Sequence, residues 1–297
     1  MSKPFDNKVV AITGAGKGLG RAYAHHFAAL GARVIVNNRR HEGEQQSSAD
    51  RVVEEIVSAG GQAVAEWSSV EDQTAGDKLL ACALAHYGRL DFLVANAGVT
   101  EGRSFRKQTL EEFRAVLEIN LMGTVNVVHP VFRHLCKHGG GNIIVSTSSA
   151  GLFGGFGLPG YSTSKAAVIG LMRSLSLEGA PKKVWVNAIA PYAATQMTKA
   201  HLPDELASGL DPAEVATVVA LLANSTVSGE VLIAGGGRVA RARMKASPTV
   251  PVPEMASDDW QTLRSCAVDL EHASAGKHFE EFAASLKLGG DTQKRSS

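Results

Sequence analysis

The sequence predicts an α/β fold in which helices cover both faces of a doubly wound parallel sheet of about seven strands. Short apolar runs alternate with stretches of helical periodicity through the first 240 residues. A helix-length stretch separates each run from the next, which favours parallel pairing because parallel strands need a long crossover connection. The strands are expected near residues 9–13, 33–37, 63–67, 91–95, 142–148, 184–189 and 229–233.

Residues 241–297 lack this alternation and are predicted to form an extension to the domain of residues 1–240. Three prolines punctuate the start of the extension. Apolar side chains then recur at helical spacing from Trp260 to Ala267, which predicts one or two helices that pack on the core or on a partner subunit. The polar residues 289–297 are expected to be loose.

The composition argues against two classes of partner. The chain has 30 Lys and Arg against 29 Asp and Glu, a net charge of +1, and its charges are mixed in sign throughout. No basic stripe recommends a nucleic acid as a partner. No uninterrupted apolar run approaches the roughly 18 residues of a membrane span, and residues 1–6 lack the apolar core of a signal peptide. We expect a cytoplasmic protein with no membrane partner.

One histidine pair could in principle bind a metal. His134 and His138 are four residues apart, so a helix would present both imidazoles on one face. Three glycines follow His138 at once, which places the pair at a helix C-terminus, where cationic side chains complement the dipole. No metal site is therefore expected.

A glycine-rich turn lies near the N-terminus, between the apolar run Val9–Ile12 and a helical stretch from Arg21. Glycines let the backbone approach a pyrophosphate, whose charge is stabilised by free N–H groups and the positive end of the helix dipole. A flexible turn is the alternative, but a second apolar run, Ala32–Asn37, follows at the distance of a βαβ unit. We therefore predict that residues 1–240 bind a dinucleotide. The residues of the turn are Thr13, Gly14, Gly16, Lys17, Gly18, Leu19 and Gly20.

Tyr161 and Lys165 are four residues apart, which on a helix places the phenol and the ammonium on one face. A nearby cation favours the phenolate, so Lys165 is expected to lower the pKa of Tyr161 from about 10 toward neutral pH. Such a tyrosine could exchange a proton with a substrate oxygen. Taken alone, the spacing also fits an exposed helix pair with no chemistry.

The motifs form one ordered set: TGxxxGxG at Thr13–Gly20, NAG at Asn96–Gly98, Asn120, Ser148 and YxxxK at Tyr161–Lys165. The set covers about residues 5–240 and resembles the short-chain dehydrogenase/reductase family. That resemblance implies a Rossmann sheet in the order 3-2-1-4-5-6-7, an NAD(P) cofactor and oxidoreductase activity on CH–OH groups. Within the family, the chain looks most like the (3R)-hydroxyacyl-CoA dehydrogenase unit of type 2 peroxisomal multifunctional enzymes. The stretches that carry this finer likeness include Gly20–Ala24, Val53–Ile56 and Asn187–Pro191.

The resemblance assigns roles to four catalytic residues. Tyr161 would give or take the proton on the reacting oxygen, and Lys165 would also bind the nicotinamide ribose. Ser148 would hold the substrate carbonyl oxygen, although Ser146 and Ser149 are chemically equivalent and any of these serines could instead bind backbone at a strand end. Asn120 lies on the apolar stripe of its helix; it would sit at a helix irregularity and support a water relay to Lys165, or merely repair the helix backbone.

Cofactor selectivity is expected to depend on the end of the second strand. NAD-specific relatives place an aspartate where this chain has Asn38, and Arg39 and Lys17 add positive charge, so NADP is favoured over NAD. The alternative is that Arg39 and its neighbour Arg40 are solvated loop charges. By resemblance, the rest of the cofactor site comprises Ser69, Val70, Asn96, Ala97, Gly98, Pro191 and Thr195.

The substrate is expected to be lipophilic. The loop Gly151–Pro159 carries no charge and is largely apolar, which fits an acyl or ring substrate, or else core packing. Basic residues from Arg238 to Lys245 could bind the phosphates of a CoA thioester, or could be solvated. The favoured interpretation is an enzyme that acts on a 3-hydroxyacyl or 3-oxoacyl thioester. The alternative is a steroid or general ketone reductase, and a more distant alternative is a non-catalytic NADP-sensing protein. Relatives pair through helices near 111–137 and 160–179, so a homodimer or homotetramer is expected.

Overall fold

The computed structural model describes residues 3–41, 43–198, 203–249 and 264–292. It divides the chain into two units, Met1–Arg241 and Ala242–Ser297. The first unit contains the sheet and the site, and the second contains the C-terminal helix.

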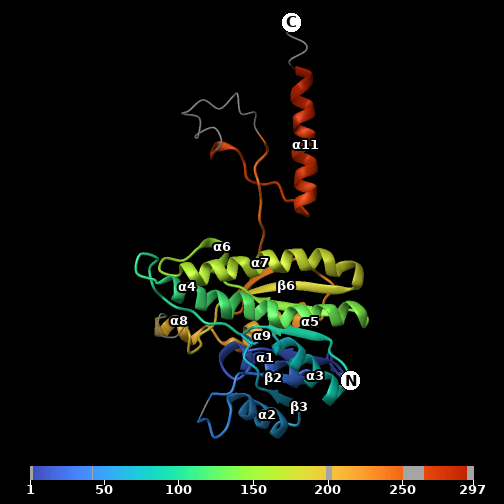
Figure 1. Ribbon diagram of the computed structural model, residues 1–297, viewed down its shortest axis with the longest axis vertical. Helices are drawn as coiled ribbons and strands as arrows, with labels where there is room; N and C mark the ends of the chain where they lie inside the picture. The colour runs from blue at the N-terminus through green and yellow to red at the C-terminus, as the bar shows by residue number, and fades with distance from the viewer. Residues whose placement is uncertain (1–2, 42, 199–202, 250–263, 293–297) are drawn as a thin grey trace. The chain divides into compact units, whose positions relative to one another are not determined.

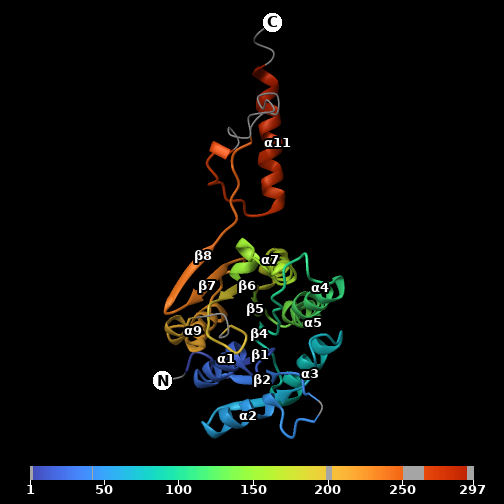
Figure 2. The ribbon, with the colours of Figure 1, turned by 90° about the vertical axis from the view of Figure 1, so that its left-hand side faces the viewer.

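The first unit is built on a sheet with the strand order β3-β2-β1-β4-β5-β6-β7-β8. Figure 2 shows this sheet between its helices. The seven expected strands all form, in the expected order, and β1 to β7 are parallel to one another. The central strands are almost wholly buried because helices cover both faces, which explains their continuous apolar runs. The strands are β1 Val9–Ile12, β2 Arg33–Asn37, β3 Gln62–Glu66, β4 Phe92–Ala95, β5 Gly141–Ser146, β6 Val184–Pro191 and β7 Val231–Gly235.

An eighth strand, β8 Arg238–Ala242, extends the sheet beyond β7. Only Gly236 and Gly237 connect the two strands, with φ angles of 57° and 66°. Positive φ at both central residues is the requirement of a type I′ hairpin turn, so β8 runs antiparallel to β7. The Gly-Gly pair was the sequence signal for this strand.

Two layers of helices cover the sheet (Figures 1 and 2). On one face α1 packs against α2 and α9; on the other, α5 packs against α3, and α7 packs against α4 and α6. Capping boxes at Ser47 and Thr109 fix the starts of α2 and α4. The helices are α1 Gly18–Ala29, α2 Ser48–Ser58, α3 Ala75–Tyr87, α4 Leu110–Leu117, α5 Gly123–Lys137, α6 Ser149–Phe153, α7 Pro159–Gly179, α8 Asp204–Ser208, α9 Pro212–Ala223 and the short 3-10 helix Ala180–Lys182.

A π-helical turn, Glu118–Met122, joins α4 to α5 and makes one helix of Leu110–Lys137. Among the described residues, this helix alone is long and apolar enough to cross a membrane, with a mean hydropathy of 1.3 and 39% of its apolar window buried. A core helix of a soluble protein passes the same test, and α5 buries apolar side chains against α3, β4 and β5. The absence of a membrane partner stays a prediction.

In the second unit, Ala246 and Leu270 form an isolated antiparallel bridge, and Arg243 pairs with Glu271. The helix α11, Ala275–Thr292, ends the described chain. The predicted helical spacing began at Trp260, which lies outside the described residues. How the extension packs stays a prediction.

Candidate active site

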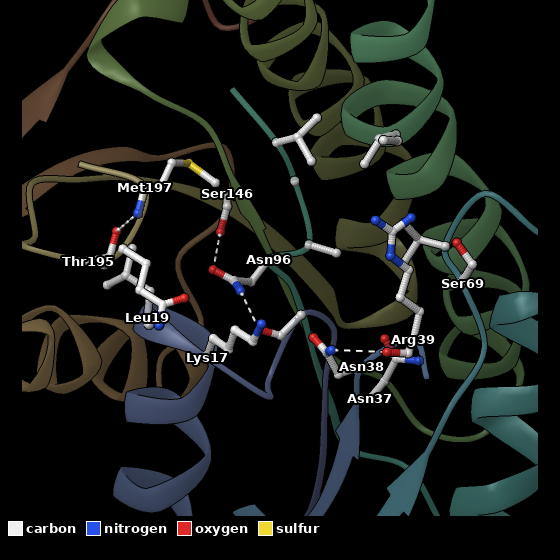
Figure 3. A pocket seen from close by; sticks show the side chains of 18 of the residues that line it. Lys17, Leu19, Asn37, Asn38, Arg39, Ser69, Asn96, Ser146, Thr195 and Met197 are labelled. Atoms are coloured by element: carbon white, nitrogen blue, oxygen red, sulfur yellow. Dashed lines mark hydrogen bonds between the residues drawn. The ribbon is translucent and has the colours of Figure 1, made fainter. Parts of the chain in front are cut away.

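A cavity of about 350 Å³ opens at the carboxyl ends of the central strands. Parallel α/β sheets bind their ligands at this edge, where the strand order reverses. In Figure 3, Thr195 and Met197 lie at one end of the cavity and Arg39 and Ser69 at the other, with Asn96 between them. Thirteen of the residues predicted to bind only the cofactor line the cavity: Gly14, Lys17, Gly18, Leu19, Asn38, Arg39, Ser69, Val70, Asn96, Ala97, Gly98, Pro191 and Thr195. Tyr161 and Lys165 line it as well.

The glycine turn forms a cradle that side chains would fill. Gly14 and Gly18 have positive φ angles of 63° and 51°, and a Cβ on Gly14 would lie 2.9 Å from the Cα of Ala97. A Cβ on Gly20 would overlap the carbonyl oxygen of Gly14. The first turn of α1 carries no acidic residue, and Lys17 at the N-cap forms no side-chain cap, so the helix N-terminus can bind an anion. Gly16 instead packs against Ser48 and lines a second hollow beside α2.

Thr13 connects this turn to the end of β4. Its side chain is 2% exposed, and its Oγ1 accepts hydrogen bonds from the backbone N–H groups of Asn96 and Ala97, both at 3.0 Å. The Asn96 side chain returns a bond from Nδ2 to the Thr13 carbonyl oxygen at 3.1 Å. Thr13 therefore lies behind the cavity and positions two residues that line it.

Burial raises the pKa of the Tyr161 phenol, and the side chain of Ser148, close enough to interact with it, opposes this rise. Ser148 is also the N-cap of α6, where its Oγ accepts from the Ala150 N–H at 3.1 Å. Of the three chemically equivalent serines, Ser148 thus has the contact to Tyr161, and it binds backbone at the same time.

Lys165 is 4% exposed, and burial lowers its pKa to about 8. Its ammonium donates to the Ser146 carbonyl oxygen at 2.8 Å and lies 5.8 Å from the centre of the Tyr161 ring. The expectation that Lys165 lowers the pKa of Tyr161 is wrong for this arrangement, because the ammonium bonds to a carbonyl and the dominant influence on the phenol is its own burial. The pair does share one helix face, as predicted.

Asn120 lies within the π-helical turn and is fully buried. Its Oδ1 accepts from the Val99 N–H at 2.8 Å, and its Nδ2 donates to the Val99 carbonyl at 2.9 Å and to Ser164 Oγ at 3.0 Å. The side chain therefore ties the helix irregularity to the segment after β4 and to α7. A Cβ on Gly98 would lie 3.0 Å from Asn120 Oδ1 and 3.3 Å from Lys165 Nζ, so Asn120 lies close behind the catalytic pair.

A family model described as short chain dehydrogenase matches residues 8–206, about two thirds of the chain. This chain is a short chain dehydrogenase. It is 37% identical to peroxisomal multifunctional enzyme A of Dictyostelium discoideum over 89% of this chain and 62% of that protein, and 36% identical to peroxisomal multifunctional enzyme type 2 of Mus musculus over 93% of this chain and 39% of that protein. The crystal structure of a short chain dehydrogenase from Mycobacterium avium superposes with a TM-score of 0.78 at 35% identity, covering 89% of this chain and 97% of that one.

These comparisons confirm the expected family and the likeness to type 2 multifunctional enzymes. The chain spans 62% and 39% of the lengths of the two multifunctional relatives, so the activities of those whole proteins do not transfer to it. As a short chain dehydrogenase, the chain is an oxidoreductase that acts on CH–OH groups with NAD(P). The glycine cradle and the open N-terminus of α1 fit the pyrophosphate of such a cofactor.

The short chain dehydrogenase cavity ends beside polar side chains from β2 and the segment after β3. Asn38 Nδ2 donates to Ser48 Oγ at 2.8 Å, while Asn37 is buried against Glu66. Arg39, which the sequence left as either a phosphate contact or a solvated charge, forms an ion pair of 3.2 Å with Glu71.

The other end of the cavity is formed by the segment after β6. A Cβ on Gly18 would lie 3.4 Å from Thr195, whose N–H donates to Thr198 Oγ1 at 2.9 Å. Several lining residues were not among those predicted: Asn37, His41, Ser68, Glu71, Val99, Ile119, Thr147, Gln196 and Met197. Ser68 and Glu71 flank the predicted residues Ser69 and Val70, and this adjacency in the sequence could have indicated both of them.

Proposed function

We propose that this short chain dehydrogenase interconverts a secondary alcohol and a ketone on a lipophilic substrate, with Tyr161 as the acid–base group. Tyr161 lines the cavity and lies beside Ser148, and this pair of hydroxyls carries the proposal. A group of two hydroxyls can bind one substrate oxygen from two directions while one of them exchanges a proton.

Each residue has a distinct part in this chemistry. NADP or NAD, when bound, accepts or supplies the hydride. Ser148 holds the substrate oxygen, and Tyr161 donates its proton during ketone reduction or accepts one during alcohol oxidation. Because burial disfavours the phenolate, the tyrosine stays protonated until the substrate oxygen takes its proton. Lys165, with a pKa of about 8, can exchange protons near neutral pH behind the phenol.

The loop between Ser148 and Tyr161 supports a lipophilic substrate. Phe153 is 74% exposed and Phe156 fully exposed, so this loop does not pack its aromatic side chains into the core. Exposed aromatic residues on the segment that joins Ser148 to Tyr161 offer apolar surface for an acyl chain or ring. We favour a 3-hydroxyacyl or 3-oxoacyl thioester, in keeping with the likeness to multifunctional relatives, over a steroid or general ketone. Arg241 pairs with Glu230 and Arg243 with Glu271, which weakens the case for these two as CoA-phosphate ligands.

NADP is the favoured cofactor in this proposal. A neutral side chain, Asn38, follows β2 where a carboxylate would repel a 2′-phosphate, and Lys17 and Arg39 both line the cavity. A homodimer or homotetramer and a cytoplasmic location stay predictions.

The test is Tyr161→Phe, which removes the hydroxyl and keeps the ring. Turnover should fall by at least about 10²-fold on any substrate that the wild type uses, with cofactor affinity largely kept. The wild type is first assayed with acyl-CoAs, acyl-carrier thioesters, steroids and simple ketones, with NADP and NAD in turn. Tyr192→Phe is the matched control, because Tyr192 is 48% exposed and lies outside the cavity lining. Near wild-type turnover by Tyr161→Phe would exclude Tyr161 as the acid–base group, and no turnover of any substrate by the wild type would favour a binding protein.

A further inference from the structure

We propose that Glu71 sets the selectivity between NADP and NAD by holding Arg39 in an ion pair that competes with a 2′-phosphate. The inference rests on the proposed function, in which Arg39 lies at the adenosine end of the cofactor site. It adds a residue that weakens NADP binding, whereas Lys17, Asn38 and Arg39 were expected only to strengthen it.

The ion pair lies in the wall of the cavity. Arg39 Nη1 is 3.2 Å from Glu71 Oε2, and both residues line the cavity together with Asn38 and Ser69. The two side chains are 49% and 40% exposed, so a ligand in the cavity can reach both. A phosphate that binds Arg39 must therefore replace or share the carboxylate.

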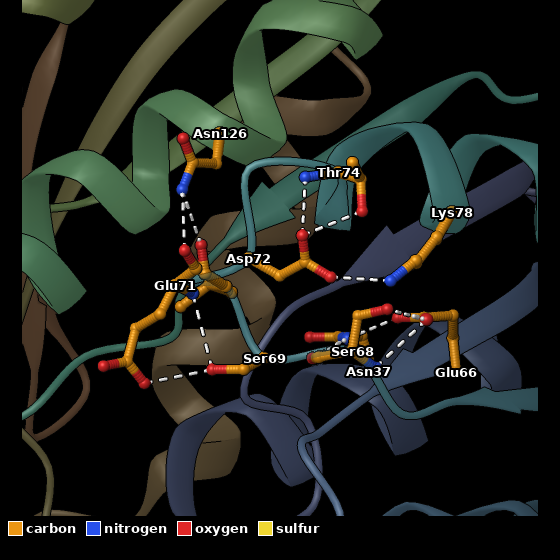
Figure 4. A network of polar contacts seen from close by, with 10 residues as sticks. Asn37, Glu66, Ser68, Ser69, Glu71, Asp72, Thr74, Lys78 and Asn126 are labelled. Atoms are coloured by element: carbon orange, nitrogen blue, oxygen red, sulfur yellow. Dashed lines mark hydrogen bonds and ion pairs between the residues drawn. The ribbon is translucent and has the colours of Figure 1, made fainter.

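Contacts within its own segment and from α5 fix the position of Glu71 (Figure 4). Ser69 Oγ donates to the same Oε2 at 3.0 Å, and the Glu71 N–H donates to Ser69 Oγ at 3.4 Å. From α5, Asn126 Nδ2 donates to the carbonyl oxygens of Val70 at 3.0 Å and Glu71 at 3.5 Å. The carboxylate is held without Arg39, so it would stay beside the site when the arginine turns to a ligand.

This charge disfavours only one of the two cofactors. A 2′-phosphate is repelled by the Glu71 carboxylate and competes with it for the guanidinium, whereas the 2′-hydroxyl of NAD carries no charge. Glu66, the other acidic side chain nearby, is buried and accepts from Asn37 and Ser68 rather than from Arg39. Glu71 is therefore the carboxylate that contacts the arginine among the described residues.

The experiment compares two nucleotides that differ only at the 2′ position. Isothermal titration of the full chain with 2′,5′-ADP and with 5′-AMP measures the adenosine end without any turnover. Glu71→Gln keeps an acceptor for Ser69 and removes the charge. It should tighten 2′,5′-ADP about two- to fivefold, the range of a partly exposed ion pair, and leave 5′-AMP unchanged. The tightening should shrink as salt is raised.

Asp72→Asn is the matched control, since it removes the next carboxylate along the chain, which pairs with Lys78 and does not line the cavity. A second arm repeats Glu71→Gln in an Arg39→Ala background, where competition is abolished and only weak repulsion remains, so the tightening should fall below about twofold. Equal tightening of both nucleotides, the same tightening from Asp72→Asn, or full tightening without Arg39 would each overturn the inference alone. Failure of the wild type to bind either nucleotide would overturn the proposed function as well.

Discussion

Replacing Thr13 by valine tests the link between the glycine turn and the end of β4. Valine keeps the shape of threonine, so the change leaves no cavity. It removes the acceptor of the Asn96 and Ala97 N–H groups. Each buried donor left without a partner costs about 1–3 kcal/mol of stability. Burial of the methyl group that replaces the hydroxyl offsets about 1 kcal/mol of this cost. The two donors together would cost about 1–5 kcal/mol after this offset, and because both adjoin a cavity that water can reach, we expect a net loss of about 1–4 kcal/mol in the free energy of unfolding.

Urea unfolding of the two proteins measures this loss as a shift of the midpoint by about 1 M with an unchanged slope. Thr13→Ser is the control, because it keeps the hydroxyl and loses a single methyl, at a cost of about 1 kcal/mol. A valine variant at least as stable as the serine variant would refute the argument, since it would mean that the two hydrogen bonds add nothing.

Two further substitutions test the cradle and the buried lysine. Gly20→Ala should weaken NADP binding at least about tenfold in a fluorescence titration, because the new Cβ would overlap the Gly14 carbonyl and lie 2.8 Å from Asn96 Nδ2; unchanged affinity would show that the turn adapts. Lys165→Met should abolish activity yet stabilise the fold at pH 7 by up to about 3 kcal/mol, since the folded-state pKa of about 8 lies below the ordinary value near 10.4. The stability gained by the methionine variant should shrink as the pH rises from 8 to 10, because Lys165 of the folded wild type then loses its proton and with it the buried charge. A gain independent of pH in urea unfolding would contradict this.

The sequence was sufficient for the features that depend on local pattern. The strands of the sheet follow from apolar runs, and the glycine turn from spacing, because both depend on backbone geometry within a few residues. The partner of Arg39 could not be predicted, since Glu71 is 32 residues away and meets it only when β2 and β3 pair. The direction of the Tyr161 pKa shift was missed for a similar reason, because Lys165 bonds to a carbonyl on a strand that precedes it by 19 residues.

The wide turn at Glu118–Met122 has a consequence for how this chain can change in length. α4 packs against α7 while α5 packs against α3, so one continuous helix serves two neighbours. A turn that holds one residue more than an α-helical turn absorbs that residue without rotating the side chains that follow it, because the extra residue shares the same turn of the axis. Deleting one residue there would therefore leave a regular α-helix on which Val127 and Val131 keep their face. Deleting one residue elsewhere in Leu110–Lys137 would turn every later side chain by about 100° around the axis, so the wide turn is the place where this helix can change in length and still pack against both neighbours.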